Sequence, residues 1–146
     1  MLTGGPRHAL LYASGRIVTE GAREDAGAEL PFMAHTDAQA IRRDNRLLVP
    51  GVIYLRALHG NLGPFDESLP FYWDWDWYLR LFAADVDFVG PLSEAVRVSA
   101  RDNSVSASAN GAARRANLDR LAAKHGLGEL AVRNHESIAR DGNTPS

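Results

Sequence analysis

Residues 63–82 read GPFDESLPFYWDWDWYLRLF, and no other part of the chain concentrates acidic, aromatic and turn residues in this way. A helix with one apolar face repeats apolar residues at i, i+3, i+4 and i+7. Four residues follow that spacing: Trp75, Tyr78, Leu79 and Phe82. The tryptophans also alternate with aspartates as in a strand, but the helix accounts for more residues. We therefore expect a helix with Asp74 as its N-cap and Trp75 in the core.

Two charged residues fit the first turns of this helix. Asp76 lies where a carboxylate is stabilised by the positive end of the helix dipole. Arg80 follows four residues later, a spacing at which opposite charges face each other. On these residues alone, the stretch is a well-capped amphipathic helix.

Length and composition indicate one ordinary globular domain. The chain has 146 residues, of which 45% are hydrophobic and 23% charged. The net charge of −2 gives no reason to expect nucleic acid as a partner. The absence of cysteine excludes disulfides, thiolate nucleophiles and cysteine-ligated zinc. The first residues lack the pattern of a signal peptide and no apolar run is long enough to span a bilayer, so we expect a cytoplasmic protein.

Strands interleaved with helices are expected before and after the central helix. Before it we predict a strand at 8–18 with a hairpin return at Ser14-Gly15, followed by a loop or loose helix at 19–31. A helix from Thr36 to Asp44, a buried strand at 52–55 and a helix at 56–62 then complete the segment before the central helix. After it we predict strands at 86–89 and 94–98 around a Gly90-Pro91 turn, a mobile loop at 102–111, helices at 112–125 and 129–140, and a disordered tail at 141–146. In the helix at 112–125, Arg114 is placed away from the apolar face. This order predicts the α/β class.

The central stretch resembles family 2 glycosyltransferases, which have the GT-A fold. Gly63-Pro64-Phe65-Asp66-Glu67 resembles the family's G-G-F-D-E turn, with Pro64 in place of the second glycine. Residues 73–81, WDWDWYLRL, resemble its E-D-x-D-x-x-x-R-L helix start, with Trp73 in place of the glutamate. Through this resemblance, Asp74 matches the catalytic base of inverting members, and a plain helix cap is the alternative.

The resemblance extends over most of the chain but starts in the middle of the family's domain. Residues 10–18, Asn45 with Pro50-Gly51 and Arg56, and residues 98–106 are similar to later segments of that domain. The resemblance therefore implies a partial GT-A-like, Rossmann-related mixed sheet with flanking helices over residues 1–140. The N-terminal nucleotide-binding half and its D-x-D segment are missing. We expect no metal site in this chain, although the full family domain is expected to use Mg or Mn.

The resemblance also implies substrate contacts, each with a structural alternative. Asp66 and Glu67 would contact an acceptor or simply stabilise a turn. Trp73 or Trp77 would stack on a sugar or pack in the interior. Arg101 would neutralise the departing nucleoside diphosphate or be a surface arginine.

Two hypotheses follow for function. In the first, the chain is the acceptor side of an enzyme that moves a sugar from a nucleotide sugar to a saccharide or lipid-linked acceptor, inactive in isolation, with Asp74 open to a sugar-sized cavity. In the second, it is a non-catalytic saccharide-binding module or an interaction module completed by a partner. A truncated sheet would expose an unpaired edge and apolar surface, so we also expect either a homodimer formed through that edge or poor solubility.

Overall fold

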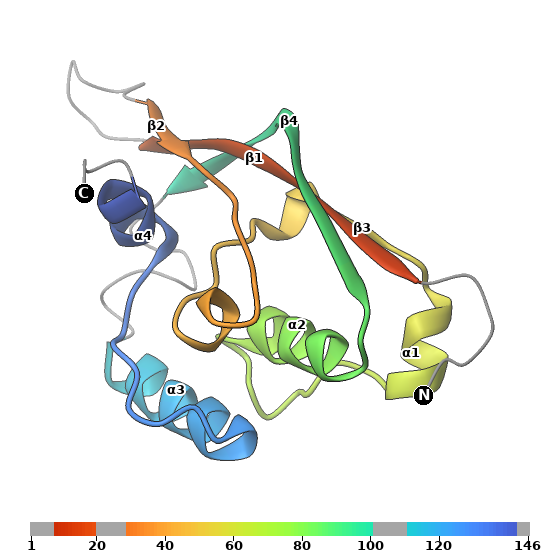
Figure 1. The fold of residues 1–146 in the computed structure, drawn as a ribbon. Coiled ribbons are helices and arrows are strands. Elements are labelled where there is room, and N and C mark those ends of the chain that lie inside the picture. Colours follow the sequence, from red (N-terminus) through yellow and green to blue (C-terminus); the bar gives the residue numbers. More distant parts are fainter. Residues whose placement is uncertain (1–7, 20–28, 101–110, 143–146) are drawn as a thin grey trace.

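The computed structural model describes residues 8–19, 29–100 and 111–142. A four-stranded sheet crosses the upper part of Figure 1, with helices beneath it. The strands are β1 (Ala9–Thr19), β2 (Glu29–Phe32), β3 (Val52–Tyr54) and β4 (Asp87–Ala100). The helices are α1 (Ala57–Leu62), α2 (Trp73–Ala83), α3 (Gly111–His125) and α4 (His135–Gly142), with 3-10 helices η1 (Ala40–Arg42) and η2 (Val49–Gly51). The predicted mixed α/β class with flanking helices is confirmed.

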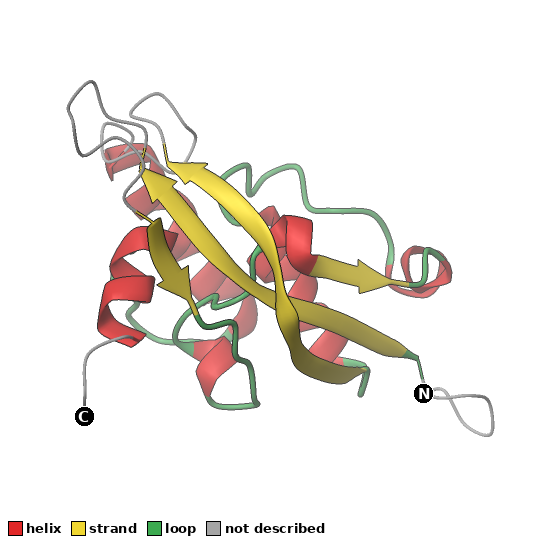
Figure 2. Ribbon diagram, turned by 90° about the horizontal axis from the view of Figure 1, so that it is seen from above, coloured by secondary structure: helices red, strands yellow, loops and turns green. Residues whose placement is uncertain are grey.

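Strand β1 is the centre of the sheet. It pairs in parallel with β4 from Ala9 to Thr19, and antiparallel with β3 at Leu10–Tyr12 and with β2 at Gly15–Val18. The β1–β4 register shifts on both sides of Ala13, and in Figures 1 and 2 the two long strands cross. The sheet therefore has one end made of β3, β1 and β4 and another made of β2, β1 and β4.

Two predicted turns are wrong, because their glycines lie inside strands. Ser14-Gly15 lies inside β1 and Gly90-Pro91 lies inside β4. A Cβ atom on Gly15 would lie 2.4 Å from the Val96 oxygen, and one on Gly90 would lie 2.5 Å from the Tyr12 oxygen. Glycine in a strand permits such close approach between backbones. The residues therefore mark where β1 and β4 approach each other.

The inner face of the sheet packs on α2 and on the other helices. The core includes the strand residues Leu10, Tyr12, Ile17 and Phe32 and the helix residues Trp75, Trp77, Leu81, Leu118 and Leu121. The predicted core position of Trp75 is confirmed, and its Nε1 donates to the Ile41 oxygen at 2.6 Å.

Local predictions in the first half of the chain had mixed outcomes. Helix α1 is confirmed, but β2 lies in a segment predicted as a loop or helix. The short helix after Thr36 is only η1, and Asp37, not Thr36, accepts hydrogen bonds from the Gln39 and Ala40 amides. Strand β3 is an edge strand with Ile53 67% exposed, so its predicted burial is wrong.

In the second half, α3 is confirmed and Gly126 follows it with a φ of +63°. Helix α4 begins only at His135. Residues 101–110 and 143–146 are outside the described residues, so the predictions of a mobile loop and a disordered tail are not tested there. Asp141 and Gly142 belong to α4, so the predicted start of the tail at Asp141 is wrong. No helix in the described ranges is long and apolar enough to cross a membrane.

Candidate functional site

Asp74 lies in the first turn of α2. The helix begins at Trp73 with Tyr72 as its N-cap, so the predicted N-cap position of Asp74 is wrong by two residues. The Asp76 amide donates to the Tyr72 oxygen at 2.9 Å, which places Tyr72 at the helix boundary. The Asp74 carboxylate still accepts hydrogen bonds from the amides of Asp74 and Trp75. It therefore satisfies exposed amides of the helix start from a position within the first turn.

The Asp74 carboxylate is buried and held in one orientation. Only 8% of the residue is exposed. Asn45 Nδ2 donates to Asp74 Oδ2 at 2.9 Å, and Asn45 Oδ1 accepts from the Leu47 amide at 3.2 Å. Burial raises the pKa of Asp74 to about 6, and the hydrogen bonds from the amides and Asn45 offset part of that rise. A carboxylate with this pKa can take up a proton near neutral pH.

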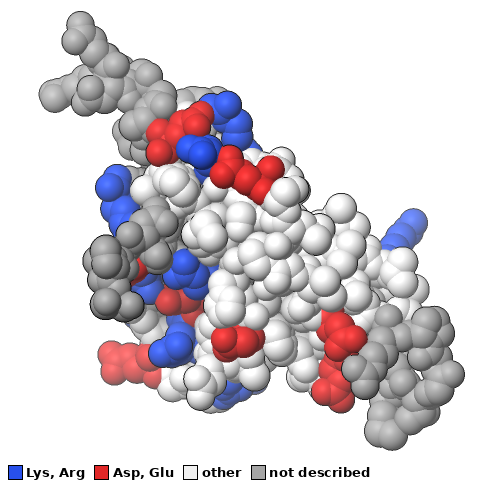
Figure 3. All heavy atoms as spheres, turned by 45° about the horizontal axis from the view of Figure 1, so that its top comes forward, with Lys and Arg blue, Asp and Glu red and all other residues white. Residues whose placement is uncertain are grey.

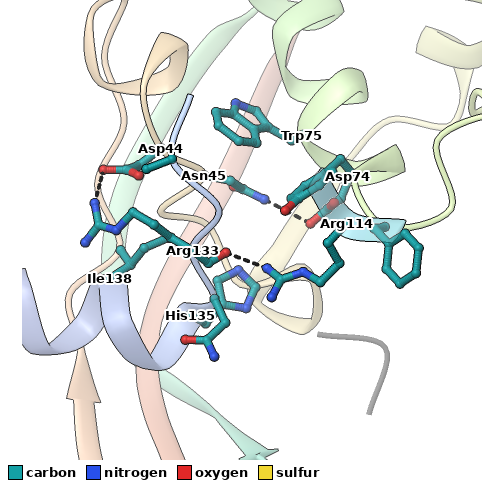
Figure 4. A pocket seen from close by; sticks show the side chains of 12 residues that line it. Asp44, Asn45, Asp74, Trp75, Arg114, Arg133, His135 and Ile138 are labelled. Atoms are coloured by element: carbon teal, nitrogen blue, oxygen red, sulfur yellow. Dashed lines mark hydrogen bonds and ion pairs between the residues drawn. The ribbon is translucent and has the colours of Figure 1, made fainter. Parts of the chain in front are cut away.

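A small cavity lies beside Asp74 (Figure 4). Its volume is about 60 Å³, room for a few water molecules but less than a hexose needs. The polar residues that line it include Asp44, Asn45, Asp74, Arg114, Arg133 and His135. The sugar-sized cavity expected at Asp74 is therefore not present in this conformation.

Two arginines border this cavity. Arg114 is only 5% exposed, and its Nη2 donates to the Arg133 oxygen at 2.6 Å. Arg133 Nη1 donates to Asp44 Oδ2 at 2.7 Å. Burial, together with the charge of Arg114, lowers the pKa of His135 to about 4, so His135 is neutral at pH 7. The cavity therefore combines carboxylates, guanidinium groups and a neutral imidazole.

The sequence prediction missed Arg114. It was placed on the outer side of its helix, but it lies four residues before the buried Leu118. That i, i+4 spacing puts both residues on one face, so the periodicity that identified the helix could have identified Arg114. Tyr72 was also missed. Its hydroxyl is buried, its ring lies 5.9 Å from the Arg114 guanidinium, and the residue lines the cavity.

Asp76 has a different environment and no exposed surface. Lys124 Nζ and His125 Nε2 lie 2.8 and 2.7 Å from its Oδ1, and Arg80 Nε lies 3.1 Å from its Oδ2. Burial favours a higher pKa for Asp76, but the hydrogen bonds from His125 and Lys124 and the charges of Lys124 and Arg80 together lower it. The predicted Asp76–Arg80 pair is confirmed, and the cluster joins α2 to α3.

Asp66 and Glu67 are not among the residues that line the Asp74 cavity. Asp66 Oδ1 accepts from the amide and hydroxyl of Ser68, and its Oδ2 lies 2.9 Å from Lys124 Nζ. The Ser68 hydroxyl, followed by Lys124 and the Ser68 amide, keeps the pKa of Asp66 well below its usual range. Glu67 is exposed. These contacts give Asp66 a structural role in the turn, and acceptor binding by either residue stays a prediction.

The two candidate sugar-stacking tryptophans differ in exposure. Trp77 is 1% exposed, its ring stacks on His59 at 4.0 Å, and the Arg80 guanidinium lies 4.8 Å from its ring centre. Of the two alternatives stated for Trp77, the structure therefore favours packing in the interior, and the ring has no open face for a sugar. Trp73 is half-buried beside the exposed Phe65, with 4.8 Å between the ring centres. Trp73 stays the candidate for stacking.

The remaining candidates concern charge and metal binding. Arg101 is outside the described residues. Within residues 8–19, 29–100 and 111–142, no group of three or more histidine, aspartate or glutamate side chains could hold a metal ion. The described residues therefore do not fit a divalent metal site.

The chain is similar to an uncharacterized glycosyltransferase, YwdF, of Bacillus subtilis (strain 168). The two are 38% identical over 104 residues, which are 70% of this chain and 38% of that relative. The chain thus spans well under half the length of the relative it matches. No protein-family model matches the chain, and no solved structure matches it. The similarity supports a glycosyltransferase-like relationship.

Proposed function

We propose that this chain is the acceptor-side portion of an inverting, family 2-like glycosyltransferase, with Asp74 as its general base. A nucleotide-sugar donor and a saccharide or lipid-linked acceptor are the substrates that the sequence resemblance implies. The observation that carries the proposal is the buried Asp74 carboxylate, which Asn45 orients and whose pKa is about 6. The similarity to a glycosyltransferase over 70% of the chain supports the reaction class.

The proposed step is a single displacement at the anomeric carbon of the donor. The acceptor oxygen forms a bond to that carbon while the bond to the nucleoside diphosphate breaks, and the diphosphate leaves with the bonding electrons. The proton of the acceptor hydroxyl goes to the Asp74 carboxylate. Since Asn45 donates to Oδ2, the other oxygen of Asp74 is the one assigned to this proton.

Because the cavity beside Asp74 is small, an acceptor requires a wider opening there. The cavity walls come from different parts of the chain: Asp74 from α2, Arg114 from α3, and Arg133 from the segment before α4. A displacement of α3 or of that segment relative to α2 would enlarge it. We therefore expect acceptor binding to change the surroundings of residues on these three elements together.

NMR spectroscopy of the labelled chain tests this proposal. A panel of oligosaccharides should shift the amide signals of Asn45, Trp75 and Ala131, while UDP and GDP should leave them unchanged, because the resemblance assigns nucleotide binding to a half of the family domain that this chain does not match. Purified chain should transfer no sugar from nucleotide sugars. Signals around Asp74 that respond to no saccharide, or measurable transfer by the isolated chain, would contradict the proposal.

The matched control is Asp74→Asn, which keeps the size of the side chain and removes its charge. It should leave saccharide binding within a few-fold of wild type, because a base is needed for proton transfer more than for binding the acceptor. A loss of all binding would indicate a structural role for the carboxylate.

The size of the cavity favours one second candidate, an interaction or saccharide-binding module without turnover. About 60 Å³ beside Asp74 admits water but no sugar ring. In this case saccharides would shift signals around Trp73 and Phe65 without shifting those around Asn45. The same NMR experiment therefore separates the two candidates.

A further inference from the structure

The β3–β1–β4 end of the sheet carries an apolar row on its outer face. Leu11 pairs with Ile53 of β3 and with Val89 of β4. Paired residues on neighbouring strands project from the same face of a sheet. Leu10 and Tyr12, on either side of Leu11, project to the opposite face, and both are buried in the core. The row therefore points away from the helices.

This row is exposed. Ile53 is 67%, Val89 45% and Leu11 36% exposed. Leu55, two residues beyond Ile53, is 55% exposed, and Leu92, which pairs with Ala13, is 45% exposed. We call Leu11, Ile53, Leu55, Val89 and Leu92 the outer apolar patch. Figure 3, in which the top of the molecule comes forward, shows a broad uncharged surface bordered by charged groups.

The other end of the same face is charged. Arg16 lies 2.6 Å from Glu94 and 3.6 Å from Glu29, and Arg97 also pairs with Glu29. These four side chains are suited to water, whereas five large apolar side chains gathered at the opposite end are typical of a surface that another protein covers. The sequence agrees, because Leu10-Leu11-Tyr12 and Val52-Ile53-Tyr54 are continuous apolar runs, as in strands buried on both faces.

Pairing through a sheet edge explains this patch poorly. The outer strands of the sheet are β2, with four residues, and β3, with three, on one side of β1, and β4, with fourteen, on the other. A strand from another chain that paired at any of these edges would extend the sheet sideways. Such edge pairing would leave the face carrying Leu11 and Val89 in water. Packing of the face itself would bury all five side chains of the patch.

We propose that a second copy of this chain covers the outer apolar patch, packed face to face about a two-fold axis. A two-fold contact brings the same surface of both copies together, so that surface must complement itself. The charged end of the face meets this requirement, because two arginines and two glutamates balance there. Because these charges balance, the charged end would not attract a strongly acidic or basic partner. The proposal does not depend on glycosyl transfer.

Sedimentation velocity of the full chain over a range of concentrations tests the proposal. Wild type should form a dimer whose fraction rises with concentration. Ile53→Arg should raise the dimer dissociation constant about tenfold or more, because the apolar contact would have to bury an unpaired guanidinium. Ile53 is mostly exposed, so the variant should fold, and its thermal melt checks this. Met33→Arg is the matched control: Met33 is 54% exposed and lies outside the patch, so its dimerisation should equal that of wild type.

Because the chain contains no cysteine, a single introduced cysteine reports self-contact. Leu11→Cys, at the centre of the row, should give a covalent dimer with a short bismaleimide, and Met33→Cys should not. A chain that is monomeric at all concentrations would overturn the proposal and leave the patch to a different polypeptide. A dimer that Met33→Arg weakens as much as Ile53→Arg would also overturn it.

Discussion

Asp74 and Asp76 lie two residues apart at the start of α2, yet their carboxylates have opposite surroundings. Asp74 meets Asn45 and backbone amides, and burial raises its pKa to about 6. Asp76 is surrounded by Lys124, His125 and Arg80, which together outweigh burial and lower its pKa. Two residues turn a helix by about 200°, so the two side chains point to different neighbours.

The opposite pKa shifts of the two carboxylates suit them to different roles: Asp74 to proton transfer and Asp76 to holding helices together. Asp74 has no ion pair with the arginine, lysine and histidine residues that the structure describes, and a buried carboxylate of this kind exchanges a proton near neutral pH, as a general base requires. A buried carboxylate with three nitrogen partners stays ionised and fixes the elements that supply them. We therefore propose that Asp74 is the reactive carboxylate of this turn, whereas the Asp76 cluster joins α2 to α3.

The largest expected effect comes from Asp76→Asn. It removes the charge that Lys124, His125 and Arg80 share, and breaking a buried ion pair by removing one partner costs about 3–5 kcal/mol of unfolding free energy. Urea denaturation at pH 7 measures this loss. Because the pKa of Asp76 is lower in the folded chain, its contribution is present above about pH 4, the usual range of the group, and is lost as the pH falls further.

Asp85→Asn is the control for that variant. Asp85 is exposed and has a φ of 59°, a conformation that asparagine also tolerates. The unfolding free energy of the Asp85→Asn variant should stay within about 0.5 kcal/mol of that of wild type. If Asp76→Asn is equally mild, the cluster does not hold the helices together.

The next effect is the pH dependence of Asp74→Asn. The folded pKa of Asp74, about 6, lies above its usual value of 3.8. Its contribution to stability is therefore fully present below about pH 4 and is lost as the pH rises through about 6. A shift of about two pKa units corresponds to about 3 kcal/mol. The unfolding free energy of Asp74→Asn, measured relative to that of wild type, should therefore rise by about 2–3 kcal/mol between pH 4 and pH 7.

Urea denaturation at several pH values measures the unfolding free energies of Asp74→Asn and of wild type. Subtracting the wild-type value from that of the variant cancels the contributions of the other titrating groups. The two aspartate variants should then show opposite trends, since Asp76→Asn loses stability relative to wild type as the pH rises from acid and Asp74→Asn gains it. Parallel curves for Asp74→Asn and wild type would show that the carboxylate has an ordinary pKa and would weaken its assignment as a base.

The sequence allowed part of this turn to be predicted. Helical spacing identified α2, the core position of Trp75 and the Asp76–Arg80 pair, because all three depend on residues within two turns. It could not separate Asp74 from Asp76, since their partners Asn45 and Lys124 lie 29 and 48 residues away along the chain. The strands show the same limit: Gly15 reads as a turn until β4 is placed beside it.

The smallest effect is expected for Lys124→Met. Lys124 bridges Asp66 and Asp76, but its side chain is 37% exposed and water screens its charge. Arg80 and His125 would still hold Asp76, so we expect a loss of about 1 kcal/mol in urea denaturation at pH 7. A loss as large as that of Asp76→Asn would mean that the lysine alone supports the cluster.

Lys124 also offers a direct measurement, because it is the only lysine of the chain. Burial lowers its pKa, but its bonds to Asp76 and Asp66 outweigh burial and raise it above the usual value. Reductive methylation with a carbon-13 label keeps the charge and gives one lysine signal, whose NMR titration reports this pKa. In Asp76→Asn the value should fall, because one of two carboxylate partners is lost, whereas in Asp74→Asn it should stay unchanged. A change in both variants would show that the two carboxylates share one electrostatic environment, and the division of roles between them would then fail.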